Sequence, residues 1–184
     1  SDAQNFSNRM GVKEPIEKLS AGPIHFAFSG WAFVNIHETS QPTPDENYFL
    51  SYDHPFSFEA DAWITKNVRP EHPVCVMNAG YSSGWCEESF GISLVSTEIE
   101  CRARGDEHCR FIMAPPDRIQ EHLSRLGIET AKKSEQIGPL LIPEFFQRKR
   151  IEEELRKSHE DLQERVLERT AAAGDIPALC DSAL

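Results

Sequence analysis

The chain has 184 residues, 39% of them hydrophobic, and a formal net charge of −11 at pH 7. This length suits one ordinary domain with an appendage. So acidic a chain is not expected to bind nucleic acid or an anionic membrane directly, because both need clustered Lys and Arg side chains. No apolar run approaches the roughly 20 residues of a membrane span, and the first residues lack the apolar core of a secretory signal. We therefore expect a cytoplasmic domain.

The first third of the chain predicts mainly strands. Residues 1–20 are polar and are expected to be loose, with a short helix near Pro15–Leu19. Residues 24–38, IHFAFSGWAFVNIHE, are rich in aromatic and β-branched residues, which predicts one or two strands interrupted at a Ser-Gly pair. Pro, Asp and Asn residues then mark a loop, and a short strand is predicted at Tyr48–Tyr52.

Helices and a hairpin are predicted next. Ser57 is a candidate N-cap for a helix over residues 57–68. A second helix is predicted to begin near Ser82 and to end at Gly91. The runs SLVSTEIECRAR and CRFIMA flank a Gly-Asp turn and predict an antiparallel hairpin. Residues 115–126 predict one more helix, with prolines before it and a glycine after it.

The C-terminal part predicts a long charged helix over residues 146–170, after a connector at residues 128–145. Apolar side chains form a narrow seam along it, at Ile151, Leu155, Leu162 and Val166. A narrow seam flanked by Glu and Arg is typical of a two-stranded coiled coil, whereas a lone solvated helix of this length would be marginal. We therefore expect a homodimer. Residues 171–184 break the pattern and are expected to be a disordered tail or cloning-derived residues.

The cysteines near the hairpin turn raise the question of a metal site. Glu98, Cys101 and Cys109 lie within twelve residues around the Gly-Asp turn. Thiolate and carboxylate ligands select Zn²⁺ over Mg²⁺ or Ca²⁺, and Cys75 or Cys86 could supply the fourth ligand. On spacing alone, buried structural cysteines and a redox pair remain alternatives. A disulfide is disfavoured in the cytoplasm.

The sequence resembles a known family in this region. SFEA, then CVM, GYSSGW and TEIECRARGDEHC, resemble the effector-sensing domain of the bacterial phenol- and xylene-responsive transcription activators, within the vinyl-4-reductase domain superfamily. The resemblance implies a domain over residues 21–127, of the α+β class, with an antiparallel sheet, covering helices and a zinc-braced hairpin. It also implies one structural zinc per chain with four protein ligands, Cys75, Glu98, Cys101 and Cys109.

The resemblance further implies a buried, largely apolar pocket beside the zinc for a small aromatic or hydrophobic effector. Carried over by position, its wall residues would be Tyr52, His54, Trp85 and Ser96. The phenol sensors of this family have Trp where this chain has His54, which favours a larger or more polar aromatic than phenol. The family also uses a histidine on an early strand; His37 is the better candidate here and His25 the other.

We therefore expect a sensor and not an enzyme. No dinucleotide-binding motif is present, and a zinc with four protein ligands does not activate water. The C-terminal helix would carry the signal to a covalently attached output domain, either a histidine kinase, a diguanylate cyclase or a sigma-54-type transcription activator. The alternatives are an adaptor or tethering module of the same fold, and a reductase of tetrapyrrole synthesis.

Overall fold

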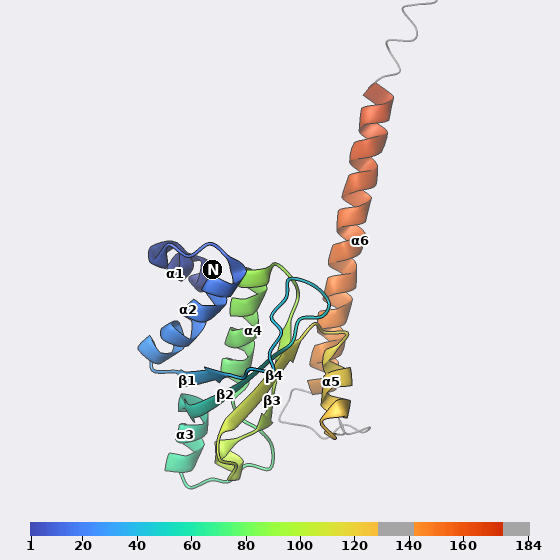
Figure 1. Cartoon of the computed structure of the whole chain (residues 1–184). Coiled ribbons are helices and arrows are strands. Elements are labelled where there is room, and N and C mark those ends of the chain that lie inside the picture. Colours follow the sequence, from blue (N-terminus) through green and yellow to red (C-terminus); the bar gives the residue numbers. More distant parts are fainter. Residues whose placement is uncertain (129–141, 175–184) are drawn as a thin grey trace, which may run out of the picture. The chain divides into compact units, whose positions relative to one another are not determined.

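A four-stranded antiparallel sheet with the strand order β1-β2-β4-β3 lies at the centre of the fold (Figure 1). The computed structural model describes residues 1–128 and 142–174. The strands are β1 (Ala32–Ile36), β2 (Leu50–Ser57), β3 (Val95–Glu100) and β4 (Cys109–Ala114). The predicted hairpin is confirmed as β3 and β4, and the strand predicted at Tyr48–Tyr52 is longer and starts two residues later.

The helices that flank this sheet are α1 (Asp2–Met10), α2 (Pro15–Phe28), α3 (Phe58–Thr65), α4 (Val76–Phe90) and α5 (Ile119–Arg125), with a short 3₁₀ helix η1 at Arg102–Arg104. A further helix, α6 (Ile142–Gly174), follows them in the chain. Within the described ranges, no helix has both the length and the apolarity that crossing a membrane requires. The predicted α+β class is confirmed.

The two faces of the sheet carry different layers. Side chains alternate between the faces along β4. Phe111 and Met113 point to one face, where α2 and α4 lie, and join a core cluster that includes Cys86. Ile112 points to the other face and packs with Leu123 of α5. The larger core therefore lies between the sheet and the α2–α4 layer (Figure 1).

The N-terminal residues differ from the prediction, because residues 1–20 are not loose. The Ser1 side chain caps α1 by accepting a hydrogen bond from the Gln4 backbone N–H. Ala3 of α1 is buried in a small cluster with Trp85 of α4. Helix α1 thus packs on the α2–α4 layer, and its polar composition reflects its exposed side.

Helix α2 occupies residues that were predicted to be a strand. It begins at Pro15 behind a capping box, and it continues to Phe28 before β1 starts. The aromatic composition suggested a strand, but the spacing of Leu19 and Phe26 places both on one buried helical face. Phe28, on the opposite side, is 88% exposed.

Helix α4 begins at Val76, well before the predicted start near Ser82, and it ends at Gly91 as predicted. Its first turn is capped from a distant part of the sequence, since the Glu59 carboxylate of α3 accepts hydrogen bonds from the backbone N–H groups of Met77 and Asn78, at 2.9 and 2.8 Å. Local sequence contains no such cap, which is why the start was placed too late. The cap predicted at Ser57 is confirmed.

Helix α6 covers the predicted helix and extends beyond it at both ends. The chain divides into two units, one ending at Phe146 and one beginning at Gln147, so most of α6 belongs to the second. The predicted seam residues are between 55% and 69% exposed. Residues 129–141 of the predicted connector and 175–184 of the predicted tail lie outside the described residues. The dimeric coiled coil remains a prediction.

Two glycines test the contact between α2 and α4. A Cβ on Gly22 would lie 3.1 Å from Trp85 Nε1, whereas a Cβ on Gly84 would meet no atom within 4 Å. Alanine at either position improves helix propensity, but only Gly22→Ala overpacks a buried contact. We expect Gly22→Ala to be less stable than Gly84→Ala by about 1–3 kcal/mol in urea unfolding. Equal stabilities would show that the α2–α4 contact yields freely.

Candidate metal centre and effector pocket

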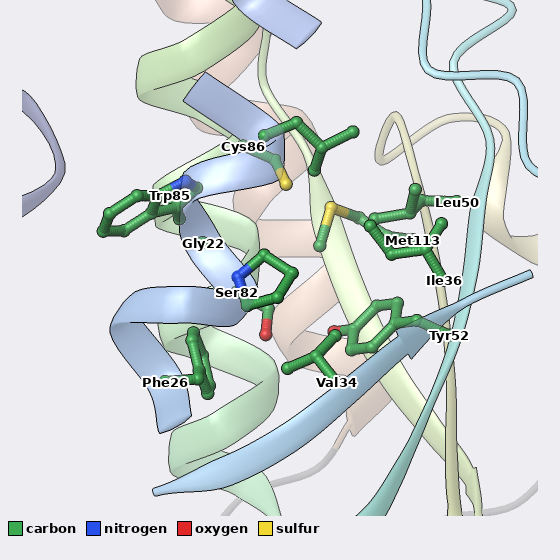
Figure 2. Close-up of a pocket in the computed structure, with 12 residues that line it drawn as sticks. Gly22, Phe26, Val34, Ile36, Leu50, Tyr52, Ser82, Trp85, Cys86 and Met113 are labelled. Atoms are coloured by element: carbon green, nitrogen blue, oxygen red, sulfur yellow. The ribbon is translucent and has the colours of Figure 1, made fainter. Parts of the chain in front are cut away.

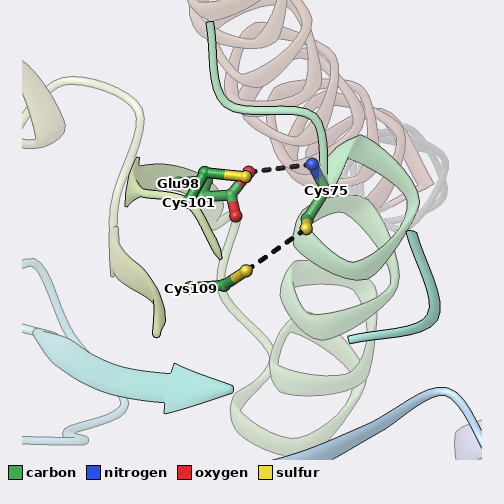
Figure 3. Close-up of side chains that lie close together, drawn as sticks. All are labelled: Cys75, Glu98, Cys101 and Cys109. Atoms are coloured by element: carbon green, nitrogen blue, oxygen red, sulfur yellow. Dashed lines mark hydrogen bonds between the residues drawn. The ribbon is translucent and has the colours of Figure 1, made fainter. Parts of the chain in front are cut away.

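Four buried or half-buried side chains bring their donor atoms together at one end of the sheet (Figure 3). The donors belong to Cys75, Glu98, Cys101 and Cys109, and all lie within 4.8 Å of one another. Cys75 is the N-cap of α4, Glu98 lies on β3, and Cys109 is the first residue of β4. The structure therefore brings Cys75, and not Cys86, to the pair of hairpin cysteines.

A bulge in the hairpin makes this convergence possible. In the β3–β4 pairing, Glu98 lies opposite Phe111 and Glu100 opposite Arg110, so the register shifts between the two glutamates. After β3 the chain turns through η1, and the Asp106 carboxylate accepts a hydrogen bond from the Cys101 backbone N–H at 2.8 Å. The bend lets Glu98 and Cys101, three positions apart, reach the same point.

The geometry of the donors fits a tetrahedral zinc ion. Cys75 Sγ and Cys109 Sγ are 3.7 Å apart, too far for a disulfide, whose sulfur atoms are about 2.0 Å apart. Two corners of a tetrahedron with Zn–S bonds of about 2.3 Å are about 3.8 Å apart. Glu98 Oε2 accepts the Cys75 backbone N–H at 2.8 Å, while the buried Oε1 has no hydrogen-bond partner. That oxygen is available to a cation.

The protonation of this group reflects its burial. Burial raises the pKa of the Glu98 carboxyl to about 8. Hydrogen bonds from the thiols of Cys109 and Cys75 lower the pKa of Cys101, and the same contacts with Cys101 raise the pKa values of the other two thiols. Without a cation the group therefore holds shared protons in a buried space. A divalent ion would replace those protons, since metal ligands bind in their deprotonated forms.

A hollow of about 340 Å³, which includes space open to solvent, lies between the sheet and the α2–α4 layer (Figure 2). Its lining is almost entirely apolar. The lining residues are Leu19, Gly22, Pro23, Phe26, Val34, Ile36, Leu50, Tyr52, Ser82, Trp85, Cys86 and Met113. Concave, apolar sites with a few polar groups are the usual form of small-molecule pockets.

Two of the predicted wall residues, Tyr52 and Trp85, line this hollow. The Tyr52 hydroxyl forms a hydrogen bond with the Ser96 hydroxyl at 2.8 Å, so Ser96 supports the wall without lining it. The Trp85 indole N–H donates to the Lys18 carbonyl oxygen at 2.9 Å. Both polar groups are therefore already satisfied within the protein.

His54 lies beyond the end of the hollow and is not among its lining residues. It is 0% exposed, and neither ring nitrogen has a hydrogen-bond partner. Its ring packs against three aromatic residues, Phe26, Tyr52 and Phe111. Burial lowers the pKa of His54 to about 4, so at pH 7 the imidazole is neutral, with one unused donor and one unused acceptor.

The two other candidate histidines are not among the lining residues of the hollow. His37 Nε2 lies 2.8 Å from an Asp53 carboxylate oxygen, and its Nδ1 is 3.0 Å from the Ser51 hydroxyl. Ser51 and Asp53 alternate with Tyr52 along β2 and so face the other side of the sheet. His25 is on α2, not on a strand, and forms a hydrogen bond with the Tyr81 hydroxyl at 3.0 Å.

Several lining residues were not foreseen from the sequence. Leu19, Pro23 and Phe26 come from α2, which was predicted to be partly loose and partly strand. Their spacing, at intervals of three and four residues, was the available signal of a helical face. Cys86, the rejected metal ligand, also lines the hollow, and burial raises the pKa of its thiol to about 12.

Residues 57–115 match the family model of the vinyl-4-reductase domain. These residues belong to the vinyl-4-reductase domain family. The matched segment contains all four converging donors together with α3, α4 and the hairpin. Helix α2 and strand β1, which form much of the lining of the hollow, precede it.

Two curated relatives share this region. The chain is 29% identical over 99 residues to the phenol regulator MopR of Acinetobacter guillouiae, covering 54% of this chain and 18% of that protein. It is 28% identical over 96 residues to the transcriptional regulatory protein XylR of Pseudomonas putida, covering 52% of this chain and 17% of that protein. The matches thus span less than a fifth of the length of either relative.

A solved structure shares the fold. The crystal structure of the phenol-responsive sensory domain of the transcription activator PoxR, with phenol, matches with a TM-score of 0.58 and 22% sequence identity. The match covers 71% of this chain and 65% of that one, which is more than the vinyl-4-reductase segment alone.

The buried His54 predicts a specific loss of stability in acid. Unfolded histidine takes up a proton near pH 6.5, whereas folded His54 resists protonation until about pH 4. Stability should therefore fall as pH drops from about 6.5 to 4, because the unfolded state binds more protons. In urea unfolding across this range, wild type should lose up to about 3 kcal/mol more than His54→Phe. Parallel pH profiles would contradict a neutral, buried imidazole.

Proposed function

We propose that this chain is a sensory domain, without catalytic activity, that binds a small aromatic or hydrophobic effector beside a structural zinc ion. One observation carries the proposal: four converging metal donors lie next to an apolar hollow on the same side of the sheet. The names of the relatives support it, since MopR is called a phenol regulator and the PoxR domain is called phenol-responsive.

Zinc would be held by Cys75, Glu98, Cys101 and Cys109 and would neutralise charge that is otherwise buried. All four positions of a tetrahedron would be filled by protein, which leaves none for substrate. The role of these residues is to join the first turn of α4 to the hairpin. Because α4 contributes Ser82, Trp85 and Cys86 to the hollow, the position of this helix determines the shape of the hollow.

The effector would enter between α2 and the sheet and pack against Phe26, Val34 and Met113. Phe26 contacts His54, with ring centroids 5.7 Å apart. A ligand that displaces the Phe26 ring could therefore reach the unused donor and acceptor of His54. This favours an aromatic effector with a polar substituent, since a polar partner would relieve the cost of the buried unpaired nitrogens.

Signal transfer would follow from unequal binding. An effector shifts an equilibrium only when it binds one conformation better than the other. We propose that this difference passes through a dimeric α6 to an attached output domain, and that the complete protein is a cytoplasmic regulator. The exposed apolar seam of α6 supports the dimer, because a solvated seam of this kind is what a partner helix covers.

Metal analysis tests the zinc. Purified chain should contain about one zinc per molecule, and Cys101→Ser should lose both the metal and cooperative unfolding, because binding energy at such sites is folding energy. Cys86→Ser is the matched control, since it replaces another buried cysteine outside the group and should retain the metal. A folded wild-type chain that takes up no zinc would contradict the site.

Ligand-induced thermal shift tests the pocket. A panel of phenols, alkylbenzenes and larger aromatics should contain compounds that raise the melting temperature of wild type. Val34→Trp should abolish the shift by filling the hollow, while Asn35→Trp, an exposed position on the same strand outside the lining, should preserve it.

The same panel separates apolar binding from polar recognition. His54→Phe should weaken compounds with a hydroxyl or carbonyl group by roughly tenfold, the effect of about 1.4 kcal/mol for one lost hydrogen bond, and leave alkylbenzenes nearly unchanged. No shift with any compound would argue for an adaptor instead of a sensor. Equal losses for both classes would remove His54 from polar recognition.

A further inference from the structure

Ser57 lies at the end of β2 and contacts the candidate metal ligand Cys75. The sequence identified Ser57 only as the cap of α3, and it does accept a hydrogen bond from the Ala60 backbone N–H at 3.5 Å. The side chain is completely buried, and its Oγ lies 3.1 Å from Cys75 Sγ. Its Oγ also accepts a hydrogen bond from the Asn78 side-chain amide at 2.8 Å.

Counting donors and acceptors assigns the direction of the Ser57–Cys75 contact. A serine hydroxyl has one proton to donate and two lone pairs that accept. The Asn78 amide and the Ala60 backbone N–H occupy the two lone pairs. The single proton of Ser57 then points to Cys75 Sγ, and a sulfur that accepts such a bond is best suited to be a thiolate, the form that binds zinc.

Asn78 is held in place independently of this contact. It is fully buried on α4, and its backbone N–H donates to the Glu59 carboxylate at 2.8 Å. With its position set by the backbone, its side-chain amide donates to Ser57 and leaves the hydroxyl proton for the sulfur. Three elements thus converge at Cys75: the end of β2, α3 through Glu59, and the first turn of α4.

Charge gives this contact a physical purpose. Three thiolates and a carboxylate carry more negative charge than one Zn²⁺ ion can neutralise, and burying the excess is costly. Hydrogen-bond donors to the ligand atoms spread that charge. Two backbone donors are already present: the Arg102 N–H lies 3.4 Å from Cys109 Sγ, and the Cys75 N–H lies 2.8 Å from Glu98 Oε2. Cys75 Sγ receives its donor from a side chain.

We propose that Ser57, oriented by Asn78, is a positioning residue for zinc, which donates a hydrogen bond to the Cys75 thiolate and holds it in the geometry that the metal requires. The inference rests on the proposed zinc site, and it adds two residues that are not metal ligands. Residues that support metal ligands in this way typically contribute about 10–100-fold to metal affinity.

The test compares zinc affinities by competition with a chromophoric chelator, and absorption spectra of the Co²⁺-substituted chain. Ser57→Ala should bind zinc about 10–100-fold more weakly, and its thiolate-to-cobalt charge-transfer band should move to lower energy because one thiolate has lost a hydrogen bond. Ser57→Thr, which keeps the hydroxyl and the cap, should restore both values. Ser89→Ala is the control, since this buried serine donates to the Trp85 carbonyl at the other end of α4.

Several outcomes separate this role from a simple helix cap. Zinc affinity within about threefold of wild type and an unmoved cobalt band in Ser57→Ala would overturn the proposal, even if unfolding stability falls. If Ser57→Ala does not fold, Asn78→Ala decides: it leaves the α3 cap intact and should weaken zinc by about tenfold or more. A wild-type chain that binds no zinc overturns the proposed site as well, whereas zinc-binding wild type with unaffected variants overturns this inference alone.

Discussion

The contact between the start of α4 and the β3–β4 hairpin is the constraint on which the arrangement of this molecule depends. Cys75 meets Cys101, Cys109 and Glu98 in a buried space where an unneutralised charge would be expensive. The same first turn of α4 takes its cap from Glu59 of α3. These contacts together set where α4 lies, and with it one wall of the hollow.

The hollow shows a second compromise between stability and function. Polar groups around it are mostly satisfied inside the protein, as with the Tyr52 and Trp85 side chains. His54 departs from this pattern, because it is completely buried and its ring nitrogens have no partner. A group kept at such a cost is a mark of function more than of stability. Its neutral form lets it donate and accept at the same time.

The lining of the hollow combines two parts of the chain with different origins. The vinyl-4-reductase segment provides Ser82, Trp85 and Cys86 from α4. Helix α2 and strand β1, which lie before that segment, provide the opposite wall. A family could thus retain its metal-binding half while the earlier half changes, which would alter the effector without disturbing the hairpin.

The sequence by itself determined the local features: the Ser57 cap, the hairpin around the Gly-Asp turn, the glycine that ends α4, and the cysteines and glutamate that meet at one point. Each depends on neighbouring residues or on a motif with fixed spacing. Tertiary structure alone decided the rest. Helix α4 starts early because Glu59 caps it from another helix, and α2 is helical because one face of its aromatic run packs on α4. His37 turns away from the hollow because strand alternation puts it beside Asp53. Contacts between distant segments leave no periodic signal, so no pattern along the chain could reveal them.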